Sequence, residues 1–179
     1  MRKRQDSLAA RLKAGNHEAA TELVDSYYRQ VYLFMRRLGH SCQVSEDLTQ
    51  ESFLQAWQHV GQLRNGRALN SWLYRIAGNV SITYWRGHKG ISSADIDGIE
   101  LPGGGDAADT DELERCEQLG RVKSAIVTLP PKLRQAVVLH YMQHLTISEA
   151  AVAAGVRQGT FKSRLNRALE ALRKQVRPL

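Results

Sequence analysis

Apolar residues recur at spacings of three and four along residues 20–38, and this periodicity constrains the fold more than any other feature of the chain. Such spacing places side chains on one face of an α-helix, and Gly39 follows where a helix C-terminus favours glycine. No segment of the first 86 residues alternates apolar and polar residues with the period of two expected of a β-strand. The sequence therefore predicts an all-α fold. The residues of the stripe are Ala20, Leu23, Val24, Tyr27, Val31, Phe34, Met35 and Leu38.

Three further helices are predicted in the N-terminal half, which is expected to form one helical domain over residues 1–88. The first covers residues 6–15, and the next begins at Ser45 as its N-cap. The last runs over about residues 71–86. The inward-facing residues that the spacing predicts for the last two helices are Phe53, Ala56, Trp57 and Val60, then Trp72, Ile76, Val80 and Tyr84.

Residues 89–111 divide the chain into two parts. Three consecutive glycines, a proline and many acids occur near this segment, and it has no helical stripe. This composition is typical of a flexible linker. A second small helical domain is therefore predicted over residues 112–179. Eight of the 18 acidic residues lie between positions 91 and 114: Asp95, Asp97, Glu100, Asp106, Asp109, Asp111, Glu112 and Glu114.

Charge narrows the classes of partner. The net charge is +7, and because the acids concentrate near the linker, the two domains are more basic than this value suggests. A strong excess of cations is expected of a protein that binds a polyanion such as nucleic acid, although solvated basic surfaces also occur on proteins without such a partner. No signal peptide or membrane span is recognised, so a cytoplasmic localisation is expected. Cys42 and Cys116 form no CxxC pair, so neither a disulfide framework nor a zinc finger is supported.

The C-terminal half contains the pattern of a helix-turn-helix. Thr146 and Glu149 form a capping box at the start of a short helix, and a turn follows at Gly155. A longer second helix then buries its apolar side, including Phe161. Its outward face offers cations for phosphates, an amide and a hydroxyl, which is the chemistry that reads a DNA major groove. A solvated amphipathic helix is the alternative interpretation. The outward residues are Lys162, Ser163, Asn166 and Arg167.

Four motifs, in this order, resemble the promoter-binding segments of bacterial sigma factors of the extracytoplasmic-function group. They are "EDLTQESFLQAW", "NSWLYRIAGNV", "LPPKLRQAVVLHY" and "GTFKSRLNRA". The resemblance covers nearly the whole chain outside the linker and the tails. It implies a transcription initiation factor that binds core RNA polymerase at the clamp helices of the large subunit. Its N-terminal domain would bind and help to melt the minus-ten element, and its C-terminal domain would read the minus-thirty-five element as duplex DNA.

The resemblance also implies a role for particular residues. The minus-thirty-five set is Arg157, Lys162, Ser163, Arg164, Asn166 and Arg167, of which Arg157 and Arg164 are assigned to phosphates. The minus-ten set is Leu63, Asn65, Ala68, Arg75 and Asn79. The polymerase-binding set is Asp47, Gln50 and Glu51. Stacking surfaces and cations for separated bases are offered by Trp85, Tyr74, Arg64, Arg67 and Arg86.

Two positions depart from the pattern of the family. Leu63 stands where close relatives often carry an aromatic residue, which puts the base preferred at that promoter position in doubt. Phe161 replaces the usual small branched residue of the helix-turn-helix core, which is expected to change the packing and not the role.

Two other functions are compatible with parts of the sequence. An enzyme is not indicated: His140 and His144 have a spacing suited to a metal, but the glutamate of the protease motif is missing between them. We therefore predict no catalytic residues, no metal and no cofactor. A stand-alone helix-turn-helix regulator, which would bind operator DNA without polymerase, is the alternative function. An anti-sigma factor that masks the polymerase-binding faces is a further expected partner, because family members are commonly held by one.

Overall fold

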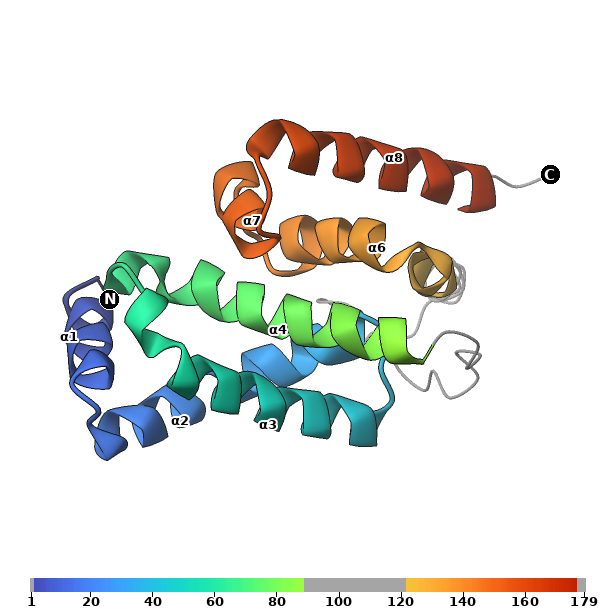
Figure 1. Ribbon diagram of the computed structural model, residues 1–179. Helices are drawn as coiled ribbons and strands as arrows, with labels where there is room; N and C mark the ends of the chain where they lie inside the picture. Colours follow the sequence, from blue (N-terminus) through green and yellow to red (C-terminus); the bar gives the residue numbers. More distant parts are fainter. Residues whose placement is uncertain (1, 89–121, 177–179) are drawn as a thin grey trace, which may run out of the picture.

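The computed structural model describes residues 2–88 and 122–176, and every regular element within them is helical (Figure 1). The all-α prediction is confirmed for these residues, which contain no strand. The predicted linker, residues 89–111, lies outside them. In chain order the elements are α1 Arg2–Lys13, α2 His17–Arg37, α3 Cys42–Gln58, the 3₁₀ turns η1 Val60–Gln62 and η2 Gly66–Ala68, α4 Leu69–Gly87, a helical segment over 122–128, α6 Pro131–Val137, the π-helical turn η3 Val138–Met142, α7 Ile147–Ala153 and α8 Gln158–Val176.

Helices α2, α3 and α4 pack together in the N-terminal half, and α1 lies across one end of them (Figure 1). Asn16 caps α2, because its side chain accepts a hydrogen bond from the Ala19 N–H at 3.0 Å. The chain leaves α2 at Gly39, whose φ of +86° is a left-handed conformation that suits glycine. Phe34 and Met35 are fully buried on the predicted stripe. The periodicity of residues 20–38 therefore predicted both the helix and the glycine at which it ends.

The start of α3 differs from the prediction. Its N-cap is Ser41 and not Ser45, because the Ser41 hydroxyl accepts a hydrogen bond from the Val44 N–H at 3.3 Å. Ser45 is fully buried inside the helix. Both serines fit the sequence signature of a cap, and Ser41 is the one that comes directly after the reversal at Gly39. The helix therefore begins one turn earlier than the following acidic residues suggested.

The C-terminal half contains the predicted helix-turn-helix. The Thr146 hydroxyl accepts a hydrogen bond from the Glu149 N–H, and the Glu149 carboxylate accepts one from the Thr146 N–H, so the capping box is complete. Gly155 has a φ of +65° at the turn, and Phe161 fills the space beneath α8 with 0 % of its surface exposed. The preceding helix starts at Pro131 and ends in the π-helical turn η3, which the sequence did not predict.

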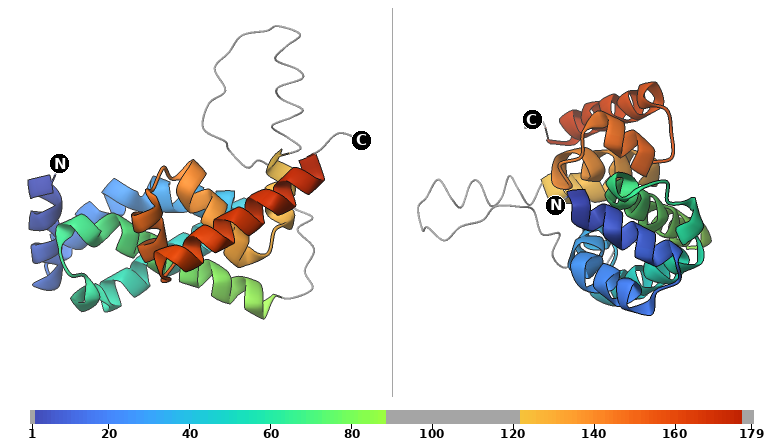
Figure 2. Two further views of the ribbon diagram at one scale, coloured as in Figure 1. Left: turned by 90° about the horizontal axis from the view of Figure 1, so that it is seen from above. Right: turned by 90° about the vertical axis from the view of Figure 1, so that its left-hand side faces the viewer.

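The two halves pack against each other along α4 (Figures 1 and 2). Helices α6 and α7 lie on one side of α4, whereas α3 packs on another. The outer face of α3 is therefore turned away from the C-terminal half in Figure 1. Within residues 2–88 and 122–176, no helix is both long enough and apolar enough to cross a membrane.

Candidate nucleic-acid interface

Helix α8 presents a polar and basic face to solvent. Most of the predicted minus-thirty-five residues are exposed there or just before it, and Arg164 is half-buried at the edge of the face. The opposite side of the helix is buried against the rest of the domain through Phe161, Leu165 and Ala168. The Ser163 hydroxyl donates a hydrogen bond to the Gly159 carbonyl at 3.1 Å, so it faces a ligand as an acceptor. The exposed residues are Arg157, Lys162, Ser163, Asn166 and Arg167.

Gln158, the first residue of α8, belongs to the same face and was missed in the sequence. Its amide Nε2 donates a hydrogen bond to the Ser148 hydroxyl of α7 at 3.1 Å, and both side chains are exposed. Residues at the N-terminus of a recognition helix contact base edges, and an amide can pair bidentately with adenine. The position of Gln158 soon after the turn at Gly155 could have indicated that it belongs to this face. The pattern alone, however, does not locate the start of a helix to within one residue.

The loop between α3 and α4 contains three of the predicted minus-ten residues. Leu63 is 1 % exposed and forms part of the hydrophobic core, so its side chain cannot meet a base while the loop has this conformation. This corrects the prediction that Leu63 lines a base pocket: the residue is apolar, and the loop folds it inward as an anchor. Asn65 is exposed, but its side chain accepts a hydrogen bond from the Ala68 N–H at 3.1 Å and so caps the turn η2. Ala68 is half-buried.

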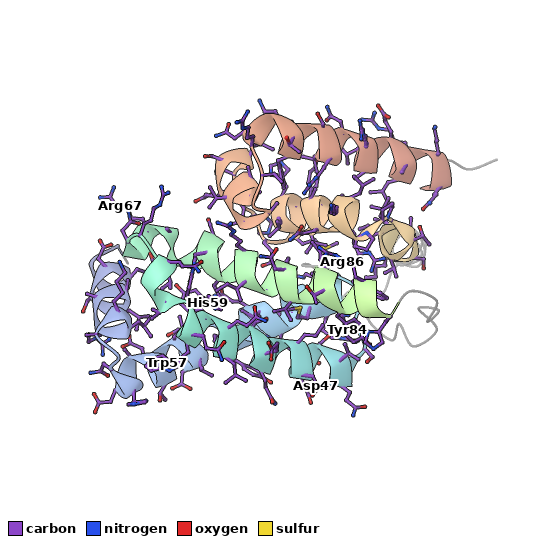
Figure 3. The ribbon with its side chains drawn as sticks, in the orientation of Figure 1. Asp47, Trp57, His59, Arg67, Tyr84 and Arg86 are labelled. Atoms are coloured by element: carbon purple, nitrogen blue, oxygen red, sulfur yellow. The ribbon has the colours of Figure 1, made fainter. Side chains whose placement is uncertain are left out.

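Two cations of this loop remain free to face a polyanion. Arg64 and Arg67 are exposed, and Figure 3 shows Arg67 projecting outward at the end of the molecule that is formed by α1 and the start of α4. Arg75 and Asn79 are exposed about two and three turns along α4. The loop and the first half of α4 thus offer polar groups along one edge of the N-terminal half.

The side of α4 that faces the C-terminal half is used for packing. Tyr74 is buried, and its hydroxyl donates a hydrogen bond to Gln143 Oε1 at 2.7 Å. Burial raises the pKa of Tyr74 to about 12, although Arg37 acts in the opposite direction. Trp85 is covered by the Arg134 guanidinium, whose Cζ lies 5.2 Å from the ring centroid. The sequence predicted that Tyr74 and Trp85 offer stacking surfaces for separated bases. In this arrangement, neither ring is free to stack on a base.

Two arginines hold the halves together, and each reaches the C-terminal end of a helix in the other half. Arg134 Nη1 of α6 donates to the Leu38 carbonyl at the end of α2, at 2.6 Å. In return, Arg37 Nη1 donates to the Met142 carbonyl at the end of η3, at 2.8 Å. Helix C-termini carry unsatisfied carbonyls and a partial negative charge, so a cation is favourable at both places. We call this pair of contacts the arginine clasp.

Two glycines of the N-terminal half make room for the clasp. A Cβ atom on Gly39 would lie 2.8 Å from Arg134 Nη1, and one on Gly78 would lie 2.0 Å from Gln135 Nε2. Gln135 is 2 % exposed, so its side chain is enclosed by the contact between the two halves. The consecutive pair Arg134 and Gln135 therefore fits a socket that only glycine permits at both positions.

His40 is buried beside the clasp. Its Nε2 lies 2.7 Å from the Ser81 hydroxyl, its ring stacks on Trp85, and its carbonyl accepts a hydrogen bond from Arg36 at 2.7 Å. Burial, and to a smaller extent the charge of the nearby Arg134, lower the pKa of His40 to about 3. The imidazole is therefore neutral at physiological pH in this arrangement. Burial also lowers the pKa of Arg134 to about 10, so this arginine keeps its charge.

The contact between the halves is polar and incompletely satisfied. Among the described residues, four buried side-chain atoms find no hydrogen-bond partner within the chain, and all four belong to residues of this contact. Each such atom costs about 1–3 kcal/mol, so the two halves are held less tightly than a domain core of the same size would be. The atoms are His40 Nδ1, Arg134 Nε, Gln135 Oε1 and Gln143 Nε2.

The outer face of α3 carries the predicted polymerase-binding residues. Asp47, Gln50 and Glu51 are all exposed, and Figure 3 shows Asp47 at the outer edge of the helix. Gln55 Nε2 donates a hydrogen bond to the Glu51 carboxylate at 2.8 Å, which holds the acid in place. Leu54 lies on the same face and is 59 % exposed. Leu54 was not among the predicted residues, although its spacing from Asp47 and Gln50 places it on this face.

His140 and Cys42 were considered in the sequence as possible metal ligands, and neither belongs to the surfaces described above. His140 Nδ1 donates a hydrogen bond to the Leu145 carbonyl at 2.9 Å, which is the role expected of a satisfied histidine. Cys42 is exposed as the first residue of α3. Within the part of the chain that the structure describes, no group of three or more His, Cys, Asp or Glu residues is arranged to hold a metal ion.

Family comparisons match the two halves separately. The family Sigma-70 region 2 matches residues 23–91, and the family Sigma-70, region 4 matches residues 119–172. The first match includes α3, the loop and α4, whereas the second includes the helix-turn-helix. The chain therefore contains both regions in the order that the four sequence motifs indicated.

Individual proteins match over nearly the whole chain. It is 30 % identical to the ECF RNA polymerase sigma factor SigW of Bacillus subtilis over 184 residues, which covers 94 % of each chain. It is 33 % identical to the ECF RNA polymerase sigma-E factor of Escherichia coli over 181 residues, which covers 96 % of this chain and 94 % of the relative. The fold is similar to that of the sigma factor RpoE from Bartonella quintana, solved in complex with the anti-sigma factor NepR. That similarity has a TM-score of 0.63 at 21 % identity and covers 87 % of this chain and 95 % of the other.

Proposed function

The chain belongs to the ECF sigma factors of bacterial RNA polymerase, and from this premise we propose which of its surfaces carries out each step of promoter recognition. A sigma factor directs core polymerase to specific promoters and assists DNA melting at the start of transcription. It is not an enzyme, because the chemistry is that of the polymerase. The alternative of a stand-alone operator-binding regulator is not supported, since the N-terminal half matches Sigma-70 region 2.

Helix α8 is assigned to the minus-thirty-five element, and its exposed basic face is the observation that carries the proposal. Lys162 and Arg167 offer charges to phosphates or guanines, whereas Asn166 offers an amide to adenine. Arg157 and Arg164 lie at the margins of the face and are assigned to phosphates. Gln158 joins the set as a further amide at the start of the helix.

The loop and the exposed edge of α4 are assigned to the minus-ten element. Arg64, Arg67 and Arg75 supply charge for the backbone of a separated strand, and Asn79 supplies an amide. Leu63 is left out of this set because it is buried. The backbone of the loop, with Asn65 as its cap, forms the wall against which an extruded base would rest.

The outer face of α3 is assigned to the polymerase. Asp47, Gln50 and Glu51 offer directional contacts to a basic helix pair, and exposed Leu54 adds apolar area at the centre of that face. This face is turned away from the C-terminal half, so polymerase can reach it in the closed chain (Figure 1). The proposed site of action is the cytoplasm, where core polymerase and DNA are found.

The closed arrangement covers part of α4, so we propose that the domains separate when the promoter is bound. The units that separate are residues 1–88 and 112–179, with 89–111 as the linker between them. The sigma factor of Bartonella quintana was solved with an anti-sigma factor. We propose that an anti-sigma factor likewise holds the two domains of this chain together in the cell.

Run-off transcription tests the proposal. Purified core polymerase would be given a promoter library with and without the full chain, and transcripts are expected only when both proteins are present. The double variant Lys162→Ala and Arg167→Ala should remove most of the transcripts, whereas Lys174→Ala, an exposed cation near the other end of α8, serves as the matched control. The proposal fails if no promoter responds, or if the chain alone binds one duplex tightly and as a dimer.

A further inference from the structure

The first helix holds the backbone of the loop between α3 and α4. The Gly66 N–H donates a hydrogen bond to Asp6 Oδ1 at 3.0 Å, and Lys13 Nζ donates to the Arg64 carbonyl at 3.3 Å. These two bonds come from residues about two turns apart on α1 and reach two points in the middle of the loop. The loop is therefore held to α1 by its main chain, while its basic side chains stay exposed.

The contact at Gly66 is backbone against backbone. A Cβ atom on Gly66 would lie 2.3 Å from the Asp6 nitrogen and 2.4 Å from the Gln5 carbonyl carbon. Any other residue at position 66 would have to push α1 away from the loop. Gly66 is buried, although the residues on either side of it are exposed. The close approach of the loop backbone to the α1 backbone therefore depends on glycine at position 66.

Helix α1 is itself fixed to the rest of the domain. Leu8 and Leu12 are buried in the hydrophobic core. Arg11 forms an ion pair with Glu22 of α2, and Gln5 Nε2 donates a hydrogen bond to the Tyr27 hydroxyl at 3.2 Å. Through these contacts, α1 holds the loop in a fixed position relative to α2. It also lies before residues 23–91, the segment that matches Sigma-70 region 2.

The other side of the loop is anchored by its own residues. Leu63 and Leu69 are buried at the two ends, and Asn65 closes the turn between them through Ala68. With α1 on one side and these anchors on the other, little freedom remains in the main chain. A wall that distinguishes one base from another must be positioned to within about 0.5 Å, which a free surface loop does not provide.

We propose that α1 positions this loop for base recognition in the minus-ten element, with Asp6 as the positioning residue and Lys13 as its helper. The inference rests on the proposed function, because it takes the loop as the place where a separated base binds. Asp6 acts through Gly66 and does not touch the DNA.

The test measures base discrimination by the holoenzyme. Core polymerase with the full chain would bind single-stranded oligonucleotides that carry each of the four bases at the preferred minus-ten position. Asp6→Ala should lower the ratio between the best and the worst base about tenfold, because the loop loses its charged acceptor. Asp6→Asn should keep most of the discrimination, since an amide oxygen can still accept from Gly66. Ser7→Ala, an exposed neighbour on α1, is the matched control.

Lys13→Ala provides a second variant in which folding is not at risk, because the side chain is exposed. It should reduce the same ratio by a smaller factor. Binding of minus-thirty-five duplex is expected to be unchanged in every variant. The inference is overturned if Asp6→Ala weakens all four oligonucleotides equally, or if Asp6→Asn is as impaired as Asp6→Ala. If the unaltered holoenzyme prefers no base at all, the proposed function of the loop fails instead.

Discussion

The two surfaces that we propose to bind DNA differ in how they are built. The face of α8 follows from one amphipathic helix: its inner side is buried and its outer side is exposed and basic. The α4 surface combines an exposed edge with a side that packs against the other domain through Tyr74 and Gly78. The first surface is ready in the free chain, whereas the second is partly occupied.

The two halves therefore differ in how accessible their proposed DNA-binding surfaces are, and not only in their charge. The arginine clasp joins them through charge-assisted hydrogen bonds, yet several buried polar atoms of the same contact remain unpaired. Such a contact suits a state that forms in the free chain and gives way to a stronger partner. Substitutions in the clasp, on α8 and on α4 should each abolish this difference in accessibility or reveal its size.

Arg134→Leu should have the largest effect. It leaves the carbonyls of Leu38, Val127 and Leu129 without their donor, and we expect the free energy of unfolding to fall by about 2–4 kcal/mol. Urea unfolding measures this loss, and small-angle scattering should show a less compact chain. Lys132→Leu, an exposed cation on the same helix, is the control. Unchanged stability and compactness would remove the clasp from the account.

Asn166→Ala and Arg157→Ala should separate base reading from phosphate binding on α8. Loss of the amide is expected to cost about 1–3 kcal/mol at one promoter position and to relax specificity there. Loss of the arginine should weaken all promoters alike and reduce the salt slope by about 1. Binding of promoter variants by holoenzyme at several salt concentrations distinguishes the two patterns. Equal effects on every promoter would contradict the division of roles.

Gly78→Ala should weaken the contact between the two domains without destabilising the N-terminal domain. Alanine favours the helix α4, but its Cβ would lie 2.0 Å from Gln135 Nε2. The closed form should therefore weaken by about 1–2 kcal/mol, as for other overpacked sites. Fluorescence transfer between the domains measures the shift, and adding Gln135→Ala should restore closure. Gly87→Ala, with open space around its Cβ on the same helix, is the control. If the two domains of Gly78→Ala stay as close together as in the unaltered chain, alanine is tolerated at position 78 and the prediction is wrong.

Mild acid, down to about pH 6, should weaken the fold through His40 by a smaller amount. The pKa of His40 is about 3 in the closed chain against an ordinary 6.5, so its contribution is present above pH 6.5 and is lost as the pH falls toward 3. The loss should reach about 1 kcal/mol near pH 6. Stability of the unaltered chain and of His40→Asn, measured from pH 7.5 to 4.5, should diverge below pH 6.5. Parallel curves would mean that His40 does not contribute. The groups facing it are Arg36, Ser45, Ser81, Tyr84, Trp85 and Arg134.

Local signals in the sequence predicted the helix-turn-helix well. The capping box at Thr146, the turn at Gly155 and the inward Phe161 each depend on residues a few positions away. The same is true of α2 and its terminal Gly39. Where two nearby serines satisfied one local rule, the prediction chose Ser45 although Ser41 is the cap.

Contacts between the domains could not be predicted in this way. Arg37 meets the Met142 carbonyl across 105 positions, and Tyr74 meets Gln143 across 69. Nothing in the pattern around Tyr74 or Trp85 shows that the C-terminal domain would cover them. Leu63 was assigned to a base pocket by its place in the motif, whereas its burial depends on how α1 closes the loop.

The distance between the two domains decides whether they separate when the promoter is bound. Labels at Asp25 on α2 and Lys174 on α8, both exposed, would report it by fluorescence transfer in the free chain and in the complex with core polymerase and promoter DNA. We predict one short distance in the free chain and a clearly longer one in the complex, with Gly78→Ala intermediate in the absence of polymerase. The same short distance in both states would contradict the claim that the α4 surface becomes fully available only when the domains separate.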